Sequence, residues 1–194
     1  MSEAIAILDL EYTAWEGSRE RGWSGPNEYR EIVEIGLLLL RGPQLGEFLA
    51  LSLYVKPQRN PLLSDYFRNL TGISQSDVDA GLSLQRAGEI LASSLARAGS
   101  AEESPIWSFG EDGDILLQNY RLLDAHCPIP DARFRNIRPQ LCTALNLPVL
   151  GVDSSQLPGA LGLEANGRHH RAVDDCRAVA LALREASRRG TRLT

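Results

Sequence analysis

Apolar residues in the first third of the chain occur in short continuous runs, a pattern typical of buried β-strands. The first run covers residues 4–8, the second residues 32–40, and the third residues 48–55, which stop before Pro57. Residues 14–30, between the first two runs, are rich in Gly, Arg and Trp without a clear period and predict a loop or a wide hairpin connection. The three consecutive strands favour an antiparallel meander.

The apolar period changes after Pro61, where spacings of three and four residues predict helices. A short strand is predicted over residues 105–109 and another near residues 132–137. Strands in a meander, followed by alternating strands and helices, predict an α/β fold whose mixed five-stranded sheet is flanked by helices, which is similar to the ribonuclease H-like fold. The predicted helices cover residues 62–70, 84–95, 111–125, 139–145, 155–163 and 170–187.

Length and charge narrow the class of protein. The 194 residues, with 43% hydrophobic content, suit a single domain over residues 1–194 that can bury a core and a pocket. A formal net charge of −5 argues against a protein that coats nucleic acid electrostatically, because such binding needs a clustered excess of cations. Any phosphate binding is therefore expected to be local.

Cysteine usage and the N-terminus indicate a reducing compartment. Cys127, Cys142 and Cys176 are odd in number and widely spaced, so they predict neither a disulfide framework nor a zinc site. The acidic start Met-Ser-Glu lacks the basic residues of a signal peptide, and no apolar run is long enough to cross a membrane. We therefore expect a cytoplasmic protein with no membrane partner.

Two acids, Asp9 and Glu11, flank Leu10 at or just beyond the predicted end of the first strand. Because side chains alternate along a strand, both carboxylates leave one face while Leu10 points into the core. Acidic pairs at strand ends also occur as caps and solvated edges, but the end of the most buried strand fits that interpretation poorly. Such oxygen ligands suit Mg²⁺ or Mn²⁺ rather than zinc.

A second acidic group lies where the strand over residues 105–109 leads into a helix, and capping of that helix is the structural alternative. Its candidates are Glu111, Asp112 and Asp114. A metal ligand on the first turn needs apolar residues three and four positions later, which dock the helix on the sheet. Only Asp112 has apolar residues at both positions, so we predict Asp112 as the ligand and Asp114 as an acid that favours the helix dipole.

The third group lies at the start of the last predicted helix, where two histidine–aspartate pairs have the same spacing and define two alternative frames. His170 pairs with Asp175, and His169 pairs with Asp174. Only the first frame leaves its acid beside the apolar face that docks this helix, which favours His170 and Asp175. A lone histidine at a helix start is usually a surface or capping residue, so the assignment depends on the other two groups.

Together the three groups resemble the DEDDh exonucleases, which include ribonuclease T, oligoribonuclease, bacterial proofreading subunits and ERI-type RNA exonucleases. The resemblance rests on Asp-x-Glu at residues 9–11, an acid after the fourth strand, and His-x-x-x-x-Asp at residues 170–175. It extends to Glu-Ile-Val-Glu-Ile-Gly at residues 31–36 and Leu-Thr-Gly-Ile at residues 70–73. In many relatives the third acid comes three residues after the glycine that ends the fourth strand. That glycine is Gly110 in this chain, so the corresponding position is Gly113.

The resemblance implies a metal-dependent 3′–5′ exonuclease that acts on the 3′ end of single-stranded RNA or DNA and releases nucleoside 5′-monophosphates. Two divalent cations, Mg²⁺ or Mn²⁺, would be held by four acids, with Asp9 shared between them. His170 would act as the general base. The implied metal ligands are Asp9, Glu11, Asp112 and Asp175.

Two other functions fit the same pattern. One is a catalytically silent nucleic-acid-binding module of the same fold, and the other is a hydrolase of small phosphoesters. RNA and DNA are not distinguished, because that choice depends on contacts to the 2′-hydroxyl. A homodimer is possible but not indicated.

Substrate contacts are expected from side chains that flank the acids. Tyr12 and Trp15 could stack on terminal bases, and core packing is the alternative, which is favoured for Phe109. Glu34 either orients neighbouring groups or faces solvent on its strand. The predicted substrate-binding residues are Leu10, Tyr12, Thr13, Trp15, Phe109 and Arg171.

Overall fold

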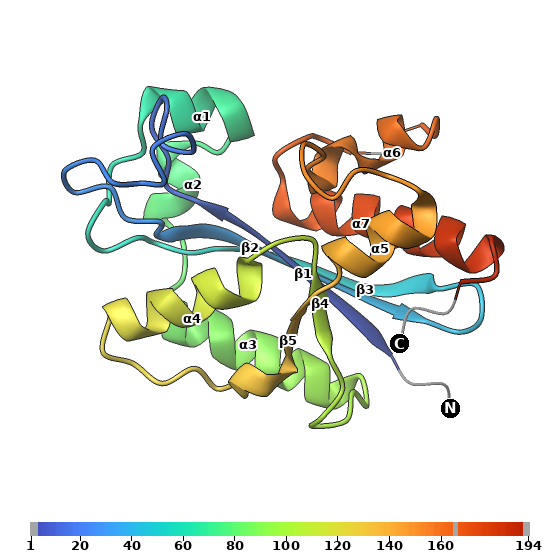
Figure 1. Ribbon diagram of the computed structural model, residues 1–194. Coiled ribbons are helices and arrows are strands. Elements are labelled where there is room, and N and C mark those ends of the chain that lie inside the picture. The colour runs from blue at the N-terminus through green and yellow to red at the C-terminus, as the bar shows by residue number, and fades with distance from the viewer. Residues whose placement is uncertain (1–3, 165–166, 192–194) are drawn as a thin grey trace.

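The computed structural model describes residues 4–164 and 167–191, and its centre is a five-stranded sheet (Figure 1). The strand order is β3-β2-β1-β4-β5; β1 pairs antiparallel with β2, β2 antiparallel with β3, and β4 parallel with both β1 and β5. This confirms the predicted mixed sheet of a meander plus parallel strands. The strands are β1 (Ile5–Tyr12), β2 (Ile32–Arg41), β3 (Gly46–Tyr54), β4 (Ile106–Ser108) and β5 (Phe134–Asn136).

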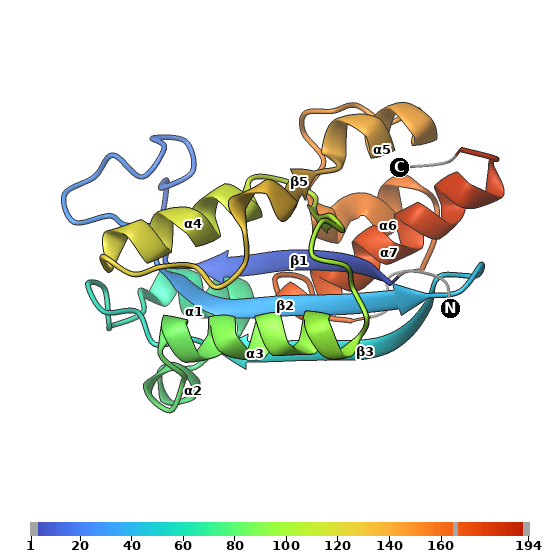
Figure 2. The same ribbon diagram turned by 90° about the horizontal axis from the view of Figure 1, so that it is seen from below.

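Helices cover both faces of the sheet. In Figure 1, α5, α6 and α7 lie on one face and α3 and α4 on the other, while α1 and α2 lie near the end of β1. Figure 2 shows α3 running along β2 on the second face. The helices are α1 (Asp65–Thr71), α2 (Gln75–Asp79), α3 (Leu84–Arg97), α4 (Asp112–Leu122), α5 (Arg138–Leu145), α6 (Leu157–Ala160) and α7 (Ala172–Arg188), with 3₁₀ turns η1 (Asp131–Arg133) and η2 (Ser154–Gln156).

The central strand β1 is buried on both faces. Leu8 and Leu10 pack with α3 and α4, whereas Ile7 packs with α5 and α7. Because side chains alternate, the odd-numbered positions of β1, which include Asp9 and Glu11, face α7. The prediction that Leu10 points into the core is confirmed.

The first strand is longer than its apolar run predicted. The two acids were expected at or beyond a strand end at residue 8, but β1 continues to Tyr12 and pairs with β2 along its whole length. Its other edge pairs with β4 only at Ala6 and Ile7. The acids therefore lie within β1 but beyond its parallel partner, since backbone pairing with β2 continues where the apolar side chains stop.

The last helix begins later than its apolar pattern predicted. Its pattern starts at His170, but α7 begins at Ala172, because His170 has a left-handed φ of 58° that an α-helix does not accommodate. Cys176 and Val179 are buried on the face of α7 that packs against the sheet, whereas Val173 is only half-buried.

Other boundaries differ by a few residues. The helix expected over residues 62–70 begins at Asp65, because the Ser64 side chain caps its first turn. The strand expected near residues 132–137 is shortened by the 3₁₀ turn that precedes it. Within the described ranges, no helix is both long enough and apolar enough to cross a membrane.

Candidate active site

Asp9 and Glu11 are buried in the second half of β1, with side chains 7% and 9% exposed. They face the first turns of α7 and lie past the short pairing between β1 and β4. The parallel pairing of β4 with β1 ends at Ile7, so the β4-side edge of β1 beyond it is open to the start of α4.

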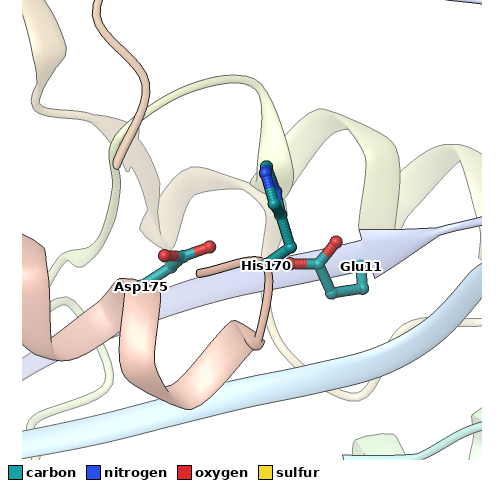
Figure 3. A group of neighbouring side chains, drawn as sticks. All are labelled: Glu11, His170 and Asp175. Atoms are coloured by element: carbon teal, nitrogen blue, oxygen red, sulfur yellow. The ribbon is translucent and has the colours of Figure 1, made fainter. Parts of the chain in front are cut away.

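The N-terminal end of α7 brings Asp175 and His170 to Glu11. One ligand atom from each of these three residues lies within 4.8 Å of the others. Figure 3 shows the carboxylates of Glu11 and Asp175 pointing toward each other, with the His170 side chain rising from the segment before α7. Asp175 is 5% exposed, so it is a buried carboxylate on the first turn of a helix.

His169 lies apart from this group. Its side chain is exposed, whereas that of His170 is half-buried. His169 lines a cavity of about 190 Å³ beside α7 together with Arg168 and Asp174, and Asp175 forms part of the wall. Of the two histidine–aspartate pairs with this spacing, only the predicted one, His170 with Asp175, has both side chains beside Glu11.

Asp112 is the first residue of α4 and reaches the same cluster. Its charge raises the pKa of Asp9, Glu11 and Asp175, whereas Asp114 is exposed. The backbone amide of Leu10 in β1 forms a hydrogen bond that favours the ionised form of Asp112. The structure thus places Asp112, rather than Asp114, beside the other acids, and the role of Asp112 as a metal ligand stays a prediction.

Position 113 has room for glycine only. Gly113 is buried, and a Cβ atom there would lie 2.5 Å from the Cβ atom of Phe134 in β5. Real Cβ atoms do not approach this closely, so no carboxylate fits at this position. The preceding residue, Asp112, is the one that the start of α4 turns toward β1.

The acids of the cluster share an environment that opposes ionisation. Burial raises the pKa of Asp9 and of Glu11 well above their ordinary values, and neighbouring carboxylates raise both further. Burial also raises the pKa of Asp175 to about 7 and that of Asp112 to about 6. Buried like charges at this density are unfavourable until cations neutralise them.

The donor set fits divalent cations of the Mg²⁺ type. Its oxygens belong to carboxylates, which such ions prefer. Among the described residues, two arginines also act on the cluster: Arg171 lowers the pKa of Glu11, and Arg138 lowers that of Asp112. These effects are smaller than the effect of burial on the same acids, so the cluster still favours added positive charge.

This environment predicts a pH-dependent stability of the metal-free protein. In the folded state Asp112 and Asp175 hold protons up to about pH 6 and 7, whereas their ordinary pKa is 3.8. Between these limits the folded state binds more protons than the unfolded chain, so the free energy of unfolding falls as pH rises. We expect the metal-free Tm to decrease from about pH 5 to 8 and saturating Mn²⁺ to remove most of the decrease.

Thermal unfolding in EDTA and in Mn²⁺ across this range measures the effect. The Asp112→Asn variant should show a shallower decrease without metal, because one of the titrating groups is gone. A metal-free Tm that rises with pH over the same range would contradict the assigned pKa shifts.

The aromatic residues after the acids form a small cluster. Tyr12 is half-buried, and its ring centroid lies 5.4 Å from that of Trp23, whose indole N–H donates a hydrogen bond of 3.0 Å to the Thr13 carbonyl. Asp112 raises the pKa of Tyr12, after the larger effect of burial, so this ring lies near the acids. Trp15 is also half-buried, and base stacking by either ring stays a prediction.

The other predicted substrate residues are occupied within the fold. The Phe109 ring is 2% exposed and packs in the core, as the favoured alternative stated, with the Arg138 guanidinium 4.7 Å above it. The Thr13 hydroxyl donates to the Tyr29 carbonyl at 2.5 Å and accepts from a backbone amide. The Arg171 guanidinium forms an ion pair with a buried glutamate in β2. Substrate contacts by these residues remain predictions.

Sequence reasoning missed two residues beside the acids, Asp153 and Ser154. The Ser154 side chain forms a hydrogen bond that lowers the pKa of Asp9. Asp153 accepts two hydrogen bonds, of 2.7 and 2.9 Å, from Arg19 and lies 3.8 Å from Arg138. These contacts tie the loop between β1 and β2 to the turn before α6. No local pattern could reveal them, because Arg19 and Asp153 are 134 residues apart.

Known proteins resemble this chain in sequence and in structure. A family model described as exonuclease, RNase T, matches residues 6–183. ERI1 exoribonuclease 2 of Xenopus laevis is 28% identical over 200 residues, which cover 92% of this chain and 27% of the relative. The 3′-5′ exonuclease eri1 of Schizosaccharomyces pombe is 29% identical over 203 residues, which cover 89% of this chain and 64% of the relative. The chain thus spans less than two thirds of either relative.

A solved structure agrees over nearly the whole chain. The nuclease domain of 3′hExo, described as a DEDDh family member bound to rAMP, is 25% identical with a TM-score of 0.84. The match covers 99% of this chain and 95% of that domain. Together with the model match over residues 6–183, this places the chain in the RNase T family of exonucleases.

Proposed function

We propose that this chain is a metal-dependent 3′–5′ exonuclease that shortens single-stranded nucleic acid and releases nucleoside 5′-monophosphates. The observation that carries the proposal is the convergence of Glu11, His170 and Asp175 within 4.8 Å, in a chain of an exonuclease family. β1 and the start of α7 are far apart in the sequence, so this convergence is a property of the fold.

Four carboxylates would hold two divalent cations, Mg²⁺ or Mn²⁺. Such ions stabilise charge on phosphoryl oxygens and make a bound water more acidic. Asp9 is the natural shared ligand, because the charges of Asp112, Asp175 and Glu11 all act on it. The metal ligands in this proposal are Asp9, Glu11, Asp112 and Asp175.

His170 would be the general base. It would accept a proton from the attacking water as the new oxygen–phosphorus bond forms. The bond to the 3′-oxygen of the preceding nucleotide would break, and that oxygen would keep the electron pair and take up a proton from solvent. Burial lowers the pKa of His170 below its ordinary value of 6.5, so the neutral imidazole is the dominant form near pH 7. A neutral ring nitrogen is the form that can accept the proton.

RNA is the favoured substrate in this proposal. The Xenopus relative is named an exoribonuclease, and the structural neighbour is described with bound rAMP. A protein distinguishes RNA from DNA by contacts to the 2′-hydroxyl of the terminal nucleotide. DNA is the second candidate, because stacking contacts by Tyr12 or Trp15 would accept either sugar.

The catalytically silent module is the alternative from another class. All four acids and the histidine are present and gathered at one place, which supports the hydrolase. We further propose that the domain extends over residues 1–194 and acts in the cytoplasm, where its three free, buried cysteines stay reduced.

A degradation assay tests the proposed function. We expect 5′-labelled single strands in Mn²⁺ to shorten progressively from the 3′ end, with mononucleotides as the second product and faster turnover of RNA than of DNA with the same sequence. Excess EDTA and the Asp9→Ala variant should each abolish the activity, because the cations would lose their shared ligand.

The alternatives give different products in this assay. Full-length strands with normal Mn²⁺ binding would favour the silent module. EDTA-insensitive cleavage would exclude the two-metal proposal, and internal fragments would exclude an exonuclease. If the protein cleaved DNA and not RNA, DNA would replace RNA as the proposed substrate.

A further inference from the structure

We propose that Glu34 in β2 and Arg171 before α7 are positioning residues, whose ion pair sets the backbone of His170 and the placement of Asp175 against Glu11. The inference rests on the proposed function of these last three residues. Of the two alternatives for Glu34, burial excludes the one in which it faces solvent, because this carboxylate is fully buried.

Glu34 lies opposite Glu11 in the pairing of β2 with β1. Both of its oxygens are occupied by protein donors. One oxygen accepts hydrogen bonds from the Ser52 hydroxyl at 2.5 Å and from Arg171 at 3.1 Å. The other accepts from Arg171 at 3.1 Å and from the Ala172 amide at 3.2 Å. With four donors around it, this carboxylate is used for structure next to the acids, rather than as a further metal ligand.

The Arg171 side chain is fixed by the hydrogen bonds that its guanidinium donates. Its guanidinium forms two hydrogen bonds with Glu34 and donates a third, of 2.7 Å, to the Tyr54 hydroxyl in β3. The residue is the N-cap of α7, and it makes no side-chain capping bond of its own. Glu34 supplies that cap from the sheet by accepting from Ala172, which also places negative charge at the helix N-terminus.

The adjacent residue, His170, is held in an unfavourable backbone conformation. Its φ of 58° lies in the left-handed region, which residues other than glycine seldom adopt. Such conformations persist when the surrounding structure determines them, and they cluster at functional sites. Here the next residue is bound to Glu34, so the chain must turn sharply at His170, and this turn directs the imidazole toward Glu11.

The start of α7 also lies directly against β2 two residues beyond Glu34. A Cβ atom on Gly36 would lie 2.4 Å from the Ala172 backbone carbon, so only glycine permits this approach. One turn later, the Cys176 thiol lies 3.6 Å from the Gly36 carbonyl. The helix is therefore seated on the strand by close backbone contact, and the ion pair fixes the end that carries Asp175.

A second ion pair between α7 and the sheet provides a matched control. Arg177 contacts Glu47 in β3 with two hydrogen bonds, of 2.9 and 3.1 Å. It joins the same helix to the same sheet, but the described contacts do not connect Glu47 with His170 or Glu11. A general role in stability would affect both pairs, whereas a positioning role affects turnover only through Glu34.

The test compares Glu34→Gln with Glu47→Gln. The glutamine amide would present a donor to the N–H groups of Arg171 or Ala172, which disrupts these hydrogen bonds while keeping the side-chain volume. We expect Glu34→Gln to lower kcat by about 10–100-fold and to weaken Mn²⁺ binding by about tenfold, with KM nearly unchanged. Glu47→Gln should change kcat and Mn²⁺ affinity by less than about twofold.

Mn²⁺ affinity, measured by calorimetry, does not require activity. It therefore tests the positioning role even if the nuclease assay fails, and thermal unfolding shows that each variant is folded. Equal kcat and equal Mn²⁺ affinity for the two folded variants would overturn the inference.

Tyr54→Phe provides a milder variant in case Glu34→Gln does not fold. It removes one hydrogen bond from Arg171 and leaves the ion pair intact. A loss of kcat of about 3–10-fold with unchanged KM would support the inference. A wild-type kcat in this variant, with Glu34→Gln unfolded, would limit the ion pair to stability and overturn the positioning role.

Discussion

Replacing Asp112 with asparagine is expected to lower kcat by about 10³-fold, whereas Asp114→Asn should stay within about twofold of the wild type. A metal ligand that stabilises the transition state by several kcal/mol accounts for an effect of this size. Both acids lie on the first turn of α4, so the second variant controls for the loss of a charge near the helix N-terminus.

The structure gives each acid a distinct environment. Asp112 receives a hydrogen bond from the Leu10 amide, and its charge acts on Asp9 and Asp175. Asp114 is exposed to solvent. Metal-dependent rates and Mn²⁺ titrations of both variants measure the difference. If Asp114→Asn lost turnover and Asp112→Asn kept it, the helix-phase argument would be wrong.

His170→Ala is expected to lower the rate at saturating metal by about 10²–10⁴-fold, the usual scale for removal of a general base. His169→Ala should change it by less than about threefold, because its exposed side chain lies outside the group of Glu11, His170 and Asp175. The two histidines are neighbours, so the pair of variants isolates the side-chain position from the local sequence.

The pH dependence adds a second criterion for the base. In the wild type the rate should rise as His170 loses its proton, at a pH below 6.5, because burial lowers its pKa. In the His170→Ala variant this rise of the rate with pH should disappear, while the Mn²⁺ affinity stays within about tenfold of the wild type. An equal loss of rate in the two alanine variants would contradict the assignment of His170.

Several features of the site followed from the sequence alone. Alternation along a strand predicted that Asp9 and Glu11 share a face and that Leu10 enters the core. The apolar period of α4 predicted Asp112 rather than Asp114 as the acid beside them. These predictions succeed because strand and helix periods are local, so the amino-acid order directly determines which side chains share a face.

Other features depended on tertiary contacts. β1 extends through its acids because β2 supplies backbone partners to its end, which hydropathy does not report. The exclusion of a side chain at position 113 comes from its close contact with Phe134 in β5. The left-handed turn at His170, which delays the start of α7 to Ala172, was not apparent in the apolar pattern.

Glu34 shows the physical reason why some features follow from the sequence and others only from the tertiary structure. Its place among apolar neighbours in β2 was compatible with solvent or with a partner, because periodicity states which face a residue occupies and not what covers that face. The helix α7 covers this face, and the partner of Glu34 is Arg171, which lies 137 residues away in the sequence. A buried carboxylate requires such a partner, but only the packing of the helix on the sheet determines which residue provides it.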